Sequence, residues 1–138
     1  MLIQVYLFFE GRCEEAVNFY HKALGAEIQM MLRYSESPEK PDPSRLAPGN
    51  ENKIMHASLK VGNSVLMLSD GGCMESTAKF AGFSVSLMVD NEAQADKIFA
   101  GLSDGGTVHM PLGQTFFAKY FGMVVDRFGV MWMLNLEK

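Results

Sequence analysis

Residues 64–70 read SVLMLSD and residues 130–136 read VMWMLNL, so one apolar pattern occurs twice, half a chain apart. The segments that precede them also match in pattern, since residues 16–30 read AVNFYHKALGAEIQM and residues 93–110 read AQADKIFAGLSDGGTVHM. Self-similarity of this kind indicates an internal duplication, and it outranks local signals in deciding a fold. The sequence therefore predicts two copies of one structural module.

The first half predicts one helix and four strands. Apolar residues at helical spacing predict a helix over residues 14–24, which ends at Gly25. Runs rich in β-branched and aromatic residues predict strands over residues 3–9, 27–34, 54–61 and 64–69. The pair Gly62-Asn63 predicts a tight hairpin between the last two strands. The order of this module is β-α-β-β-β.

The second half predicts the same order. A helix is expected over residues 91–102, capped at its start by Asp90 or Asn91. Strands are expected over residues 83–90, 107–110, 114–125 and 130–136. The fold class is therefore α+β, with βαβββ modules at about 1–70 and 82–138 joined by a linker within a single domain, 1–138. Each helix covers one face of its sheet, and we expect the two modules to form a curved, partly open mixed sheet around a cavity suited to a small ligand.

Composition narrows the function classes. The chain has 138 residues, a net charge of −4 and a pI near 5.3, which argues against nucleic acid because phosphate backbones require clustered Lys and Arg. The apolar run at residues 5–9 is too short to cross a bilayer or to form a signal-peptide core, so we expect a cytoplasmic protein without a membrane partner. The eleven methionines suit flexible core filling, which we take as the role of most, or an adaptable ligand pocket.

The cysteines and the proline-rich loop are less informative. Two cysteines without ligand-like spacing favour neither a disulfide nor a zinc site. Residues 35–53 hold four of the five prolines and predict a long polar loop, which is either a lid over a site or a plain mobile loop.

The chain resembles the vicinal oxygen chelate superfamily, which includes glyoxalase I, extradiol dioxygenases, and the bleomycin and fosfomycin resistance proteins. More narrowly, it resembles the PhnB-like group, whose members are also labelled 3-demethylubiquinone-9 3-methyltransferase-like. The matching stretches are AVNFYHKALGAE at 16–27, IMHASLKVGNSVLMLSD at 54–70, GFSVSLMVD at 82–90 and QTFFAKYFGMVVDRFGVMWMLN at 114–135. A methyltransferase activity rests on that label alone, because the chain has no glycine-rich nucleotide turn after a strand.

The resemblance implies four positions at which metal-using members place His or Glu ligands. They fall on Gln4 (or Val5, if the turn after the first strand carries no insertion), Met67, Ser84 and Met133. Divalent ions of this class require imidazole and carboxylate donors, whereas thioethers, a hydroxyl and an amide carry no charge. We therefore expect no metal site and no cofactor, which argues against glyoxalase or dioxygenase chemistry.

Strand alternation predicts the residues that face the cavity. The set is aromatic and thioether in character, with a few polar groups, which suits a small and partly apolar ligand. Its predicted members are Gln4, Tyr6, Phe8, His56, Ser58, Met67, Ser69, Ser84, Ser86, Met133 and Asn135, with Gln114 and either Phe117 or Lys119.

His56 and Asp70 are the candidate catalytic residues. A histidine near Asp70 or Ser69 would serve as a general base, although His56 as a hydrogen-bonded structural residue and Asp70 as a turn cap remain open. Asp126 is expected to form a turn, and Trp132 to pack in the core beneath a helix.

Three function classes remain open, because fold analogy alone does not decide function. The first is a metal-independent small-molecule binding protein. The second is an enzyme on the same scaffold, either metal-free with His56 and Asp70 or a metal-dependent lyase, dioxygenase or resistance-type transferase. The third is a protein that mainly associates with a protein partner. Because sheet edges need partners, a homodimer is also expected.

Overall fold

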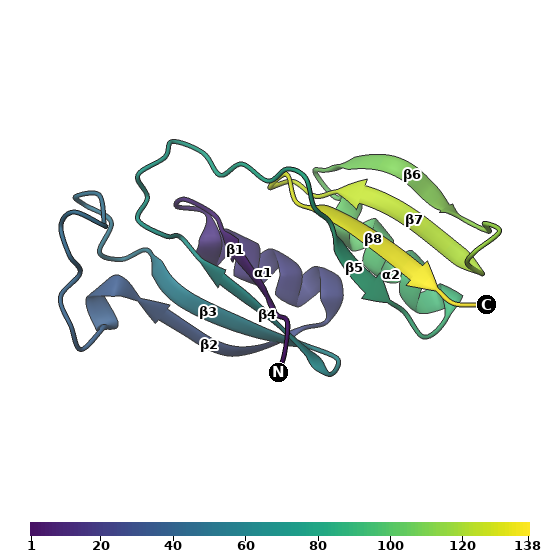
Figure 1. Ribbon diagram of the computed structural model, residues 1–138, viewed down its shortest axis with the longest axis horizontal. Helices are drawn as coiled ribbons and strands as arrows, with labels where there is room; N and C mark the ends of the chain where they lie inside the picture. The colour runs from purple at the N-terminus through teal and green to yellow at the C-terminus, as the bar shows by residue number, and fades with distance from the viewer. The chain divides into compact units, whose positions relative to one another are not determined.

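The computed structural model describes all residues from 1 to 138. The chain divides into two compact units, an N-terminal unit, Met1–Ala78, and a C-terminal unit, Lys79–Lys138. Each unit consists of one four-stranded mixed sheet and one α-helix (Figure 1). This confirms the predicted α+β fold with two βαβββ modules.

The N-terminal unit follows the predicted order closely. Its elements are β1 (Val5–Phe8), α1 (Cys13–Leu24), β2 (Glu27–Arg33), the short 3₁₀ turn η1 (Tyr34–Glu36), β3 (Ile54–Val61) and β4 (Ser64–Ser69). The strands lie in the order β1-β4-β3-β2, with β1 parallel to β4 and the other pairs antiparallel. Helix α1 ends at Gly25, whose φ of 64° is the left-handed conformation that glycine adopts readily.

The C-terminal unit repeats this arrangement. Its elements are β5 (Val85–Met88), α2 (Glu92–Ser103), β6 (Thr107–Gly113), β7 (Tyr120–Val125) and β8 (Met131–Leu136). The strands lie in the order β5-β8-β7-β6, and β5 is parallel to β8. Asn91, one of the two predicted caps, begins α2 by accepting a hydrogen bond from the Gln94 backbone N–H at 2.8 Å.

The predicted strand over residues 114–125 is too long at its start. Strand β7 begins only at Tyr120, because a turn precedes it in which the Thr115 side chain accepts from the Ala118 backbone N–H at 3.0 Å. Strand β6 is longer than predicted and includes Pro111. Proline is tolerated there because β6 lies at the edge of its sheet.

The core of each unit lies between the helix and one face of the sheet. In the C-terminal unit, Trp132 and Leu134 of β8 are buried together with Phe99 of α2, which confirms the predicted core position of Trp132. At Gly122 an added Cβ would lie 2.9 Å from side-chain atoms of Phe99 and Leu112. The absence of a side chain at this position therefore allows α2 to pack closely on β7.

The methionines are not in the core. None of the eleven is buried, so the prediction that most of them fill the core is wrong. Valine, leucine and tryptophan occupy the helix-covered faces of β7 and β8, and methionine occupies the opposite face. Separately, neither helix is long and apolar enough to cross a membrane.

Candidate functional site

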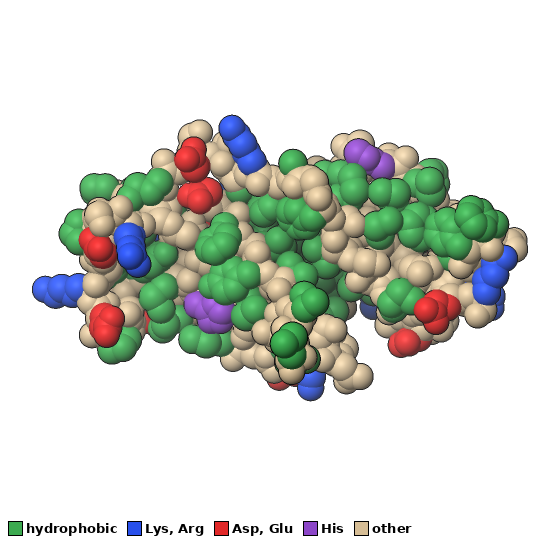
Figure 2. Space-filling view, in the orientation of Figure 1, with side chains coloured by type: hydrophobic (Ala, Val, Ile, Leu, Met, Phe, Trp, Pro, Cys, Tyr) green, Lys and Arg blue, Asp and Glu red, His purple; other side chains and the backbone are tan.

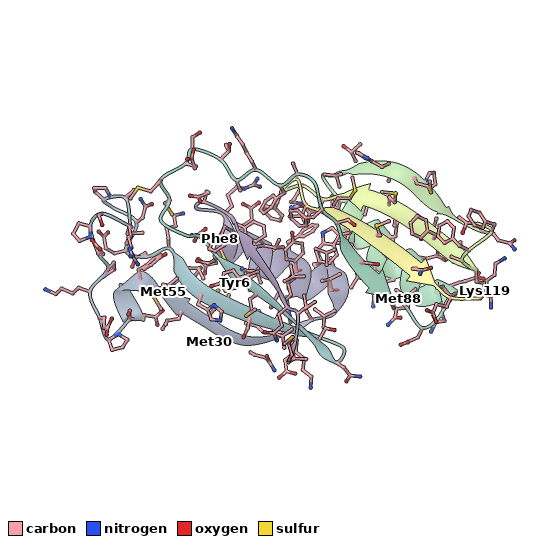
Figure 3. All side chains as sticks on the ribbon, in the orientation of Figure 1. Tyr6, Phe8, Met30, Met55, Met88 and Lys119 are labelled. Atoms are coloured by element: carbon pink, nitrogen blue, oxygen red, sulfur yellow. The ribbon has the colours of Figure 1, made fainter.

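The helix-free face of the N-terminal sheet carries most of the predicted ligand-binding residues of that unit. Strand register places one residue from each strand in a row that runs Met30, Ser58, Met67, Tyr6. Residues that are paired directly across strands point to the same side of the sheet. This row lies on the sheet face that α1 does not cover, because Leu66 and Leu68, which flank Met67, are buried on the helix side. Figure 3 labels Tyr6, Phe8 and Met30 on this unit.

Tyr6 and His56 form a hydrogen-bonded pair on this face. The Tyr6 hydroxyl lies 2.8 Å from His56 Nδ1, and the two ring centroids are 5.5 Å apart. Phe8 stacks on Tyr6, with ring centroids 5.0 Å apart and an interplanar angle of 27°. Tyr6 is 38% exposed and Phe8 is 51% exposed, so both rings are accessible from solvent. The result is an aromatic surface with one imidazole beside it.

Either partner can be the donor in this pair, because a tyrosine hydroxyl both donates and accepts. Burial raises the pKa of the Tyr6 phenol, outweighing the opposing hydrogen bond with Ser69, so the hydroxyl stays protonated at neutral pH. A Tyr6 hydroxyl that donates to Nδ1 of a neutral imidazole leaves the ring proton on Nε2. No protein group is hydrogen-bonded to His56 Nε2. Nε2 of His56 is therefore free beside the two stacked rings, and it is an N–H donor when Tyr6 donates to Nδ1.

Asp70 does not pair with His56. Its side chain is 1% exposed, and it accepts hydrogen bonds from the backbone N–H groups of Gly11 at 2.7 Å, Cys13 at 2.8 Å and Ile54 at 2.8 Å. These contacts cap the start of α1, which has no side-chain cap at Arg12, and join that start to β3. The structure thus gives Asp70 the capping role that the sequence left open, and its carboxylate is not hydrogen-bonded to His56.

Ser69 and Gln4 differ in their surroundings. Ser69 is buried and its hydroxyl accepts from the Gly71 backbone N–H at 2.9 Å, so it stabilises the turn that follows β4. Gln4 is exposed and precedes β1. Neither side chain is hydrogen-bonded to His56.

The open face of the C-terminal sheet carries the remaining predicted residues. Register places Met110, Met123, Met133 and Ser86 in one row across β6, β7, β8 and β5. The Ser84 hydroxyl lies 2.9 Å from the Met133 sulfur. Figure 2 shows hydrophobic side chains gathered over β6 and β7 of this unit.

Aromatic rings and an amide adjoin this row. Phe117 packs edge-on against Phe121 with centroids 5.0 Å apart, whereas Gln114 and Lys119 are exposed. The Asn135 Nδ2 group lies 3.6 Å from the Met88 sulfur, and Asn135 Oδ1 is buried without a hydrogen-bond partner. Buried amide oxygens are usually satisfied, so Asn135 is a polar group that a ligand or a water molecule can still bind.

Sequence reasoning missed several members of these rows. Met30 shares the row of Met67, and Met110 and Met123 share the row of Met133. The predicted strands of Met30 and Met110 were assigned no open-face residues, and the strand of Met123 was assigned only residues near its predicted start. The sequence signal for them is that each methionine lies in a strand next to one with predicted cavity-facing residues. The Tyr6–His56 contact had no sequence signal, since it joins residues of different strands that are not directly paired.

The candidate ligand positions do not fit a divalent metal ion. In the N-terminal unit they offer an amide from Gln4 and a thioether from Met67, and in the C-terminal unit Ser84 donates to Met133. No group of three or more His, Cys, Asp or Glu side chains is suitably placed to hold a metal ion. The donor chemistry therefore argues against the ion that metal-using relatives employ.

A hollow of about 240 Å³ lies on the N-terminal unit, close to the start of α1 and the end of the 35–53 loop. Its charged groups already have partners within the protein. Arg33 forms an ion pair with Glu14 at 2.6 Å, which lowers the pKa of that carboxyl, and Lys53 Nζ donates to the Gly11 carbonyl at 2.8 Å. The hollow is lined by Gly11, Glu14, Arg33, Gly49, Asn52, Lys53, Ile54 and Asp70.

The 35–53 loop, which the sequence leaves open as a lid or a mobile segment, is tied to the rest of the unit. Leu46 is buried, and the Ala47 backbone N–H donates to the Gly72 carbonyl at 2.8 Å. These contacts hold the middle of the loop against the turn after β4.

A family model and a curated relative both match nearly the whole chain. The model of the Glyoxalase/Bleomycin resistance protein/Dioxygenase superfamily matches residues 2–134. Protein YjdN of Escherichia coli (strain K12) is 32% identical over 143 residues, which cover 100% of this chain and 97% of YjdN.

Two solved structures are similar in sequence and in fold. Protein PA1353 from Pseudomonas aeruginosa is 45% identical, with a TM-score of 0.85 over 99% of this chain and 98% of that one. A Bacillus cereus protein described as a putative 3-demethylubiquinone-9 3-methyltransferase, PhnB protein, is 31% identical, with a TM-score of 0.78 over 99% of each chain. Together with its duplicated βαβββ fold, these matches show that the chain belongs to the glyoxalase/bleomycin resistance/dioxygenase superfamily and is similar to its PhnB and YjdN proteins.

Proposed function

We propose that this protein binds a small, partly planar organic molecule without the help of a divalent metal ion. The observation that carries the proposal is the Tyr6–His56 pair, which is accessible from solvent and stands beside the stacked Phe8 ring. Pockets for small molecules combine apolar and aromatic surface with a few fixed polar groups. The open face of the N-terminal sheet has this combination.

The chemistry of this face indicates which molecules fit. The two stacked rings favour a planar aromatic or conjugated group, since such rings pack in offset or edge arrangements. With Tyr6 as the donor to Nδ1, the free Nε2–H of His56 favours a hydrogen-bond acceptor, and a carboxylate or phosphonate oxygen is the strongest kind. Met67 lies opposite Tyr6 and Met30 stands at the other end of the same row, and their flexible side chains adapt to ligands of different shape. We therefore propose an aromatic acid as the ligand class.

An acid–base enzyme on this scaffold would have to use the same pair. Asp70 is unavailable because its carboxylate already accepts three backbone N–H groups. His56 with Tyr6 is then the only candidate general base among the residues that the sequence singles out. Binding is the simpler role for this pair, because one imidazole N–H donor is sufficient for recognition.

We also propose that the protein is a homodimer. Both units expose large apolar side chains, among them Ile3 and Phe116, which is 90% exposed. Large exposed apolar side chains that gather into patches mark interaction sites. Sedimentation equilibrium is expected to give twice the chain mass of 15.3 kDa, and a single-chain mass at micromolar concentration would contradict the proposal.

The ligand proposal is tested by thermal unfolding in the presence of EDTA with a panel of aromatic carboxylates and phosphonates. A compound that binds only the native state adds about 2.7 kcal/mol to the free energy of unfolding at a concentration of 100 times its Kd. His56→Ala is expected to weaken the binding of a responding compound about tenfold or more, the value of one hydrogen bond to a charged group.

The matched control for this test is His109→Ala, because His109 is an exposed histidine of β6 in the other unit. Tyr6→Phe retains the ring stack but removes the hydroxyl that orients His56, so an intermediate loss is expected. A compound whose affinity is the same in His56→Ala, Tyr6→Phe and the unchanged protein would rule out this face as the site. Divalent metal that remains bound stoichiometrically after purification would contradict the metal-free mechanism.

A further inference from the structure

The thioether row of the C-terminal unit is the feature that neither the family nor the proposed ligand explains. Met123 lies opposite Met133 in regular register, and Met110 is paired with Met123 between two register shifts in β6. Strand pairing thus brings three thioethers from three adjacent strands next to one another. Met131 and Met88 lie on the same face, beside Met133 and Asn135. Apolar packing does not require methionine here, because the same strands use valine, leucine and tryptophan in the core.

We propose that Met110, Met123 and Met133 bind a soft monovalent metal ion, Cu(I). Thioether sulfur is a soft, uncharged donor that selects Cu(I) over harder divalent ions. Uncharged thioether donors, which do not fit the family's divalent metal ion, therefore favour a soft monovalent ion. The proposed site lies within one unit and is independent of the ligand proposed for the N-terminal sheet.

The row has suitable geometry for one ion. Directly opposed residues of a regular antiparallel pair have Cβ atoms about 4.5–5.5 Å apart, which applies to Met123 and Met133. Met110 is the partner of Met123 on the other side, where β6 is irregular. Each methionine side chain has three rotatable bonds, which lets the flanking sulfurs bend toward the centre. Met110 is 43% exposed and Met123 and Met133 are half-buried, so an ion has access from solvent. The Ser84 hydroxyl contacts the Met133 sulfur at 2.9 Å and positions it.

The N-terminal unit provides a natural comparison. Its equivalent row runs Met30, Ser58, Met67, Tyr6, so a serine replaces the central methionine and only two separated thioethers remain. Three thioethers in adjacent strands occur only in the C-terminal row. We therefore expect the ion to bind that unit and not its duplicate.

The test uses Ag(I), a soft monovalent probe that does not change oxidation state in the assay, with protein carrying ¹³C-methyl methionine. Cys73→Ser is used as the background because Cys73 is a partly accessible thiol that would compete, whereas Cys13 is 0% exposed. In chloride-free buffer, one equivalent of Ag(I) is expected to shift the methyl signals of Met110, Met123 and Met133 together. The signals of Met1, Met30, Met67 and Met74 are expected to remain in place.

Two variants complete the experiment. Met123→Leu retains size, and Met123→Ser copies the residue found at the equivalent position, Ser58. Each is expected to lower the affinity for Ag(I) at least about tenfold, since even outer-shell changes cost metal sites 10–100-fold. Cu(I) competition with a chromophoric chelator under anaerobic, reducing conditions is expected to give the same ranking.

The proposal is overturned if the exposed Met1 and Met74 signals respond as early as the three row signals, or if Met123→Leu binds Ag(I) unchanged. Neither result affects the aromatic-acid proposal, which is measured with EDTA on the N-terminal unit. Conversely, if no compound in the screen binds, the aromatic-acid proposal fails, and the methyl shifts of the three methionines still test the Cu(I) proposal.

Discussion

Replacement of Asp70 by alanine is expected to destabilise the N-terminal unit by about 3–5 kcal/mol, the cost of removing one partner from a buried charged network. The carboxylate accepts three backbone N–H groups, from Gly11, Cys13 and Ile54, and its side chain is 1% exposed. Alanine leaves two buried donors, of Cys13 and Ile54, and the part-buried donor of Gly11 without an acceptor. Each buried donor left unpaired costs about 1–3 kcal/mol. Because small proteins are stable by only about 5–15 kcal/mol, this one change removes a large part of the total.

Urea unfolding measures the loss in the free energy of unfolding, and the reactivity of the Cys13 thiol shows whether the start of α1 is the part destabilised. Cys13 donates its backbone N–H to Asp70 and is 0% exposed, and burial raises the pKa of its thiol. Faster labelling of Cys13 in Asp70→Ala is expected, because the thiol reacts only when the start of α1 opens. The stability of Asp70→Asn should lie between those of Asp70→Ala and the unchanged protein. The amide retains one acceptor oxygen but places an N–H₂ group against a backbone donor.

Asp90→Ala is the control for this measurement, because Asp90 is exposed and its carboxylate has no hydrogen-bond partner. Substitutions of this kind usually change stability by less than about 0.5 kcal/mol. Equal stabilities for Asp70→Ala and Asp90→Ala would show that the three hydrogen bonds contribute nothing, and would reopen a chemical role for Asp70.

Replacement of Asp126 by alanine is expected to destabilise the C-terminal unit by about 2–4 kcal/mol through unsatisfied buried donors. Its carboxylate accepts from the backbone N–H groups of Phe128 at 2.9 Å and Val130 at 3.1 Å, and from Trp132 Nε1 at 2.8 Å. The prediction that Asp126 forms a turn is thus confirmed, and the turn is tied to the core through Trp132. Urea unfolding followed by Trp132 fluorescence measures the change.

A double-mutant cycle with Trp132→Phe isolates the side-chain part of this contact. Phenylalanine lacks the indole N–H but retains most of the buried ring, so the single change removes mainly one hydrogen bond. Residues in direct contact of this kind show coupling of about 0.5–3 kcal/mol. Far-UV circular dichroism follows unfolding where the indole is absent. Additive effects of the two substitutions would contradict the role assigned to the Asp126–Trp132 contact.

The two buried aspartates show why catalytic roles are difficult to assign from sequence. Asp70 follows a strand and precedes two glycines, a context that fits both a turn cap and an acid near a site. Which role it has depends on the backbone N–H groups of Gly11 and Ile54, which are remote in sequence and meet the carboxylate only in the folded unit. His56 has the same ambiguity, and its partner proved to be Tyr6 rather than Asp70.

By itself, the sequence determined the duplicated α+β fold and, to within two residues, most strand and helix limits. Local periodicity, capping residues and the repeat act over short distances along the chain, and the limits of β3 and β4 agree with prediction at every residue. The tertiary structure alone decided the Tyr6–His56 contact, the three donors on Asp70 and the alignment of Met110, Met123 and Met133. The physical reason is that strand register, which brings distant residues opposite one another, depends on how whole strands pair and pack, and no short segment specifies it.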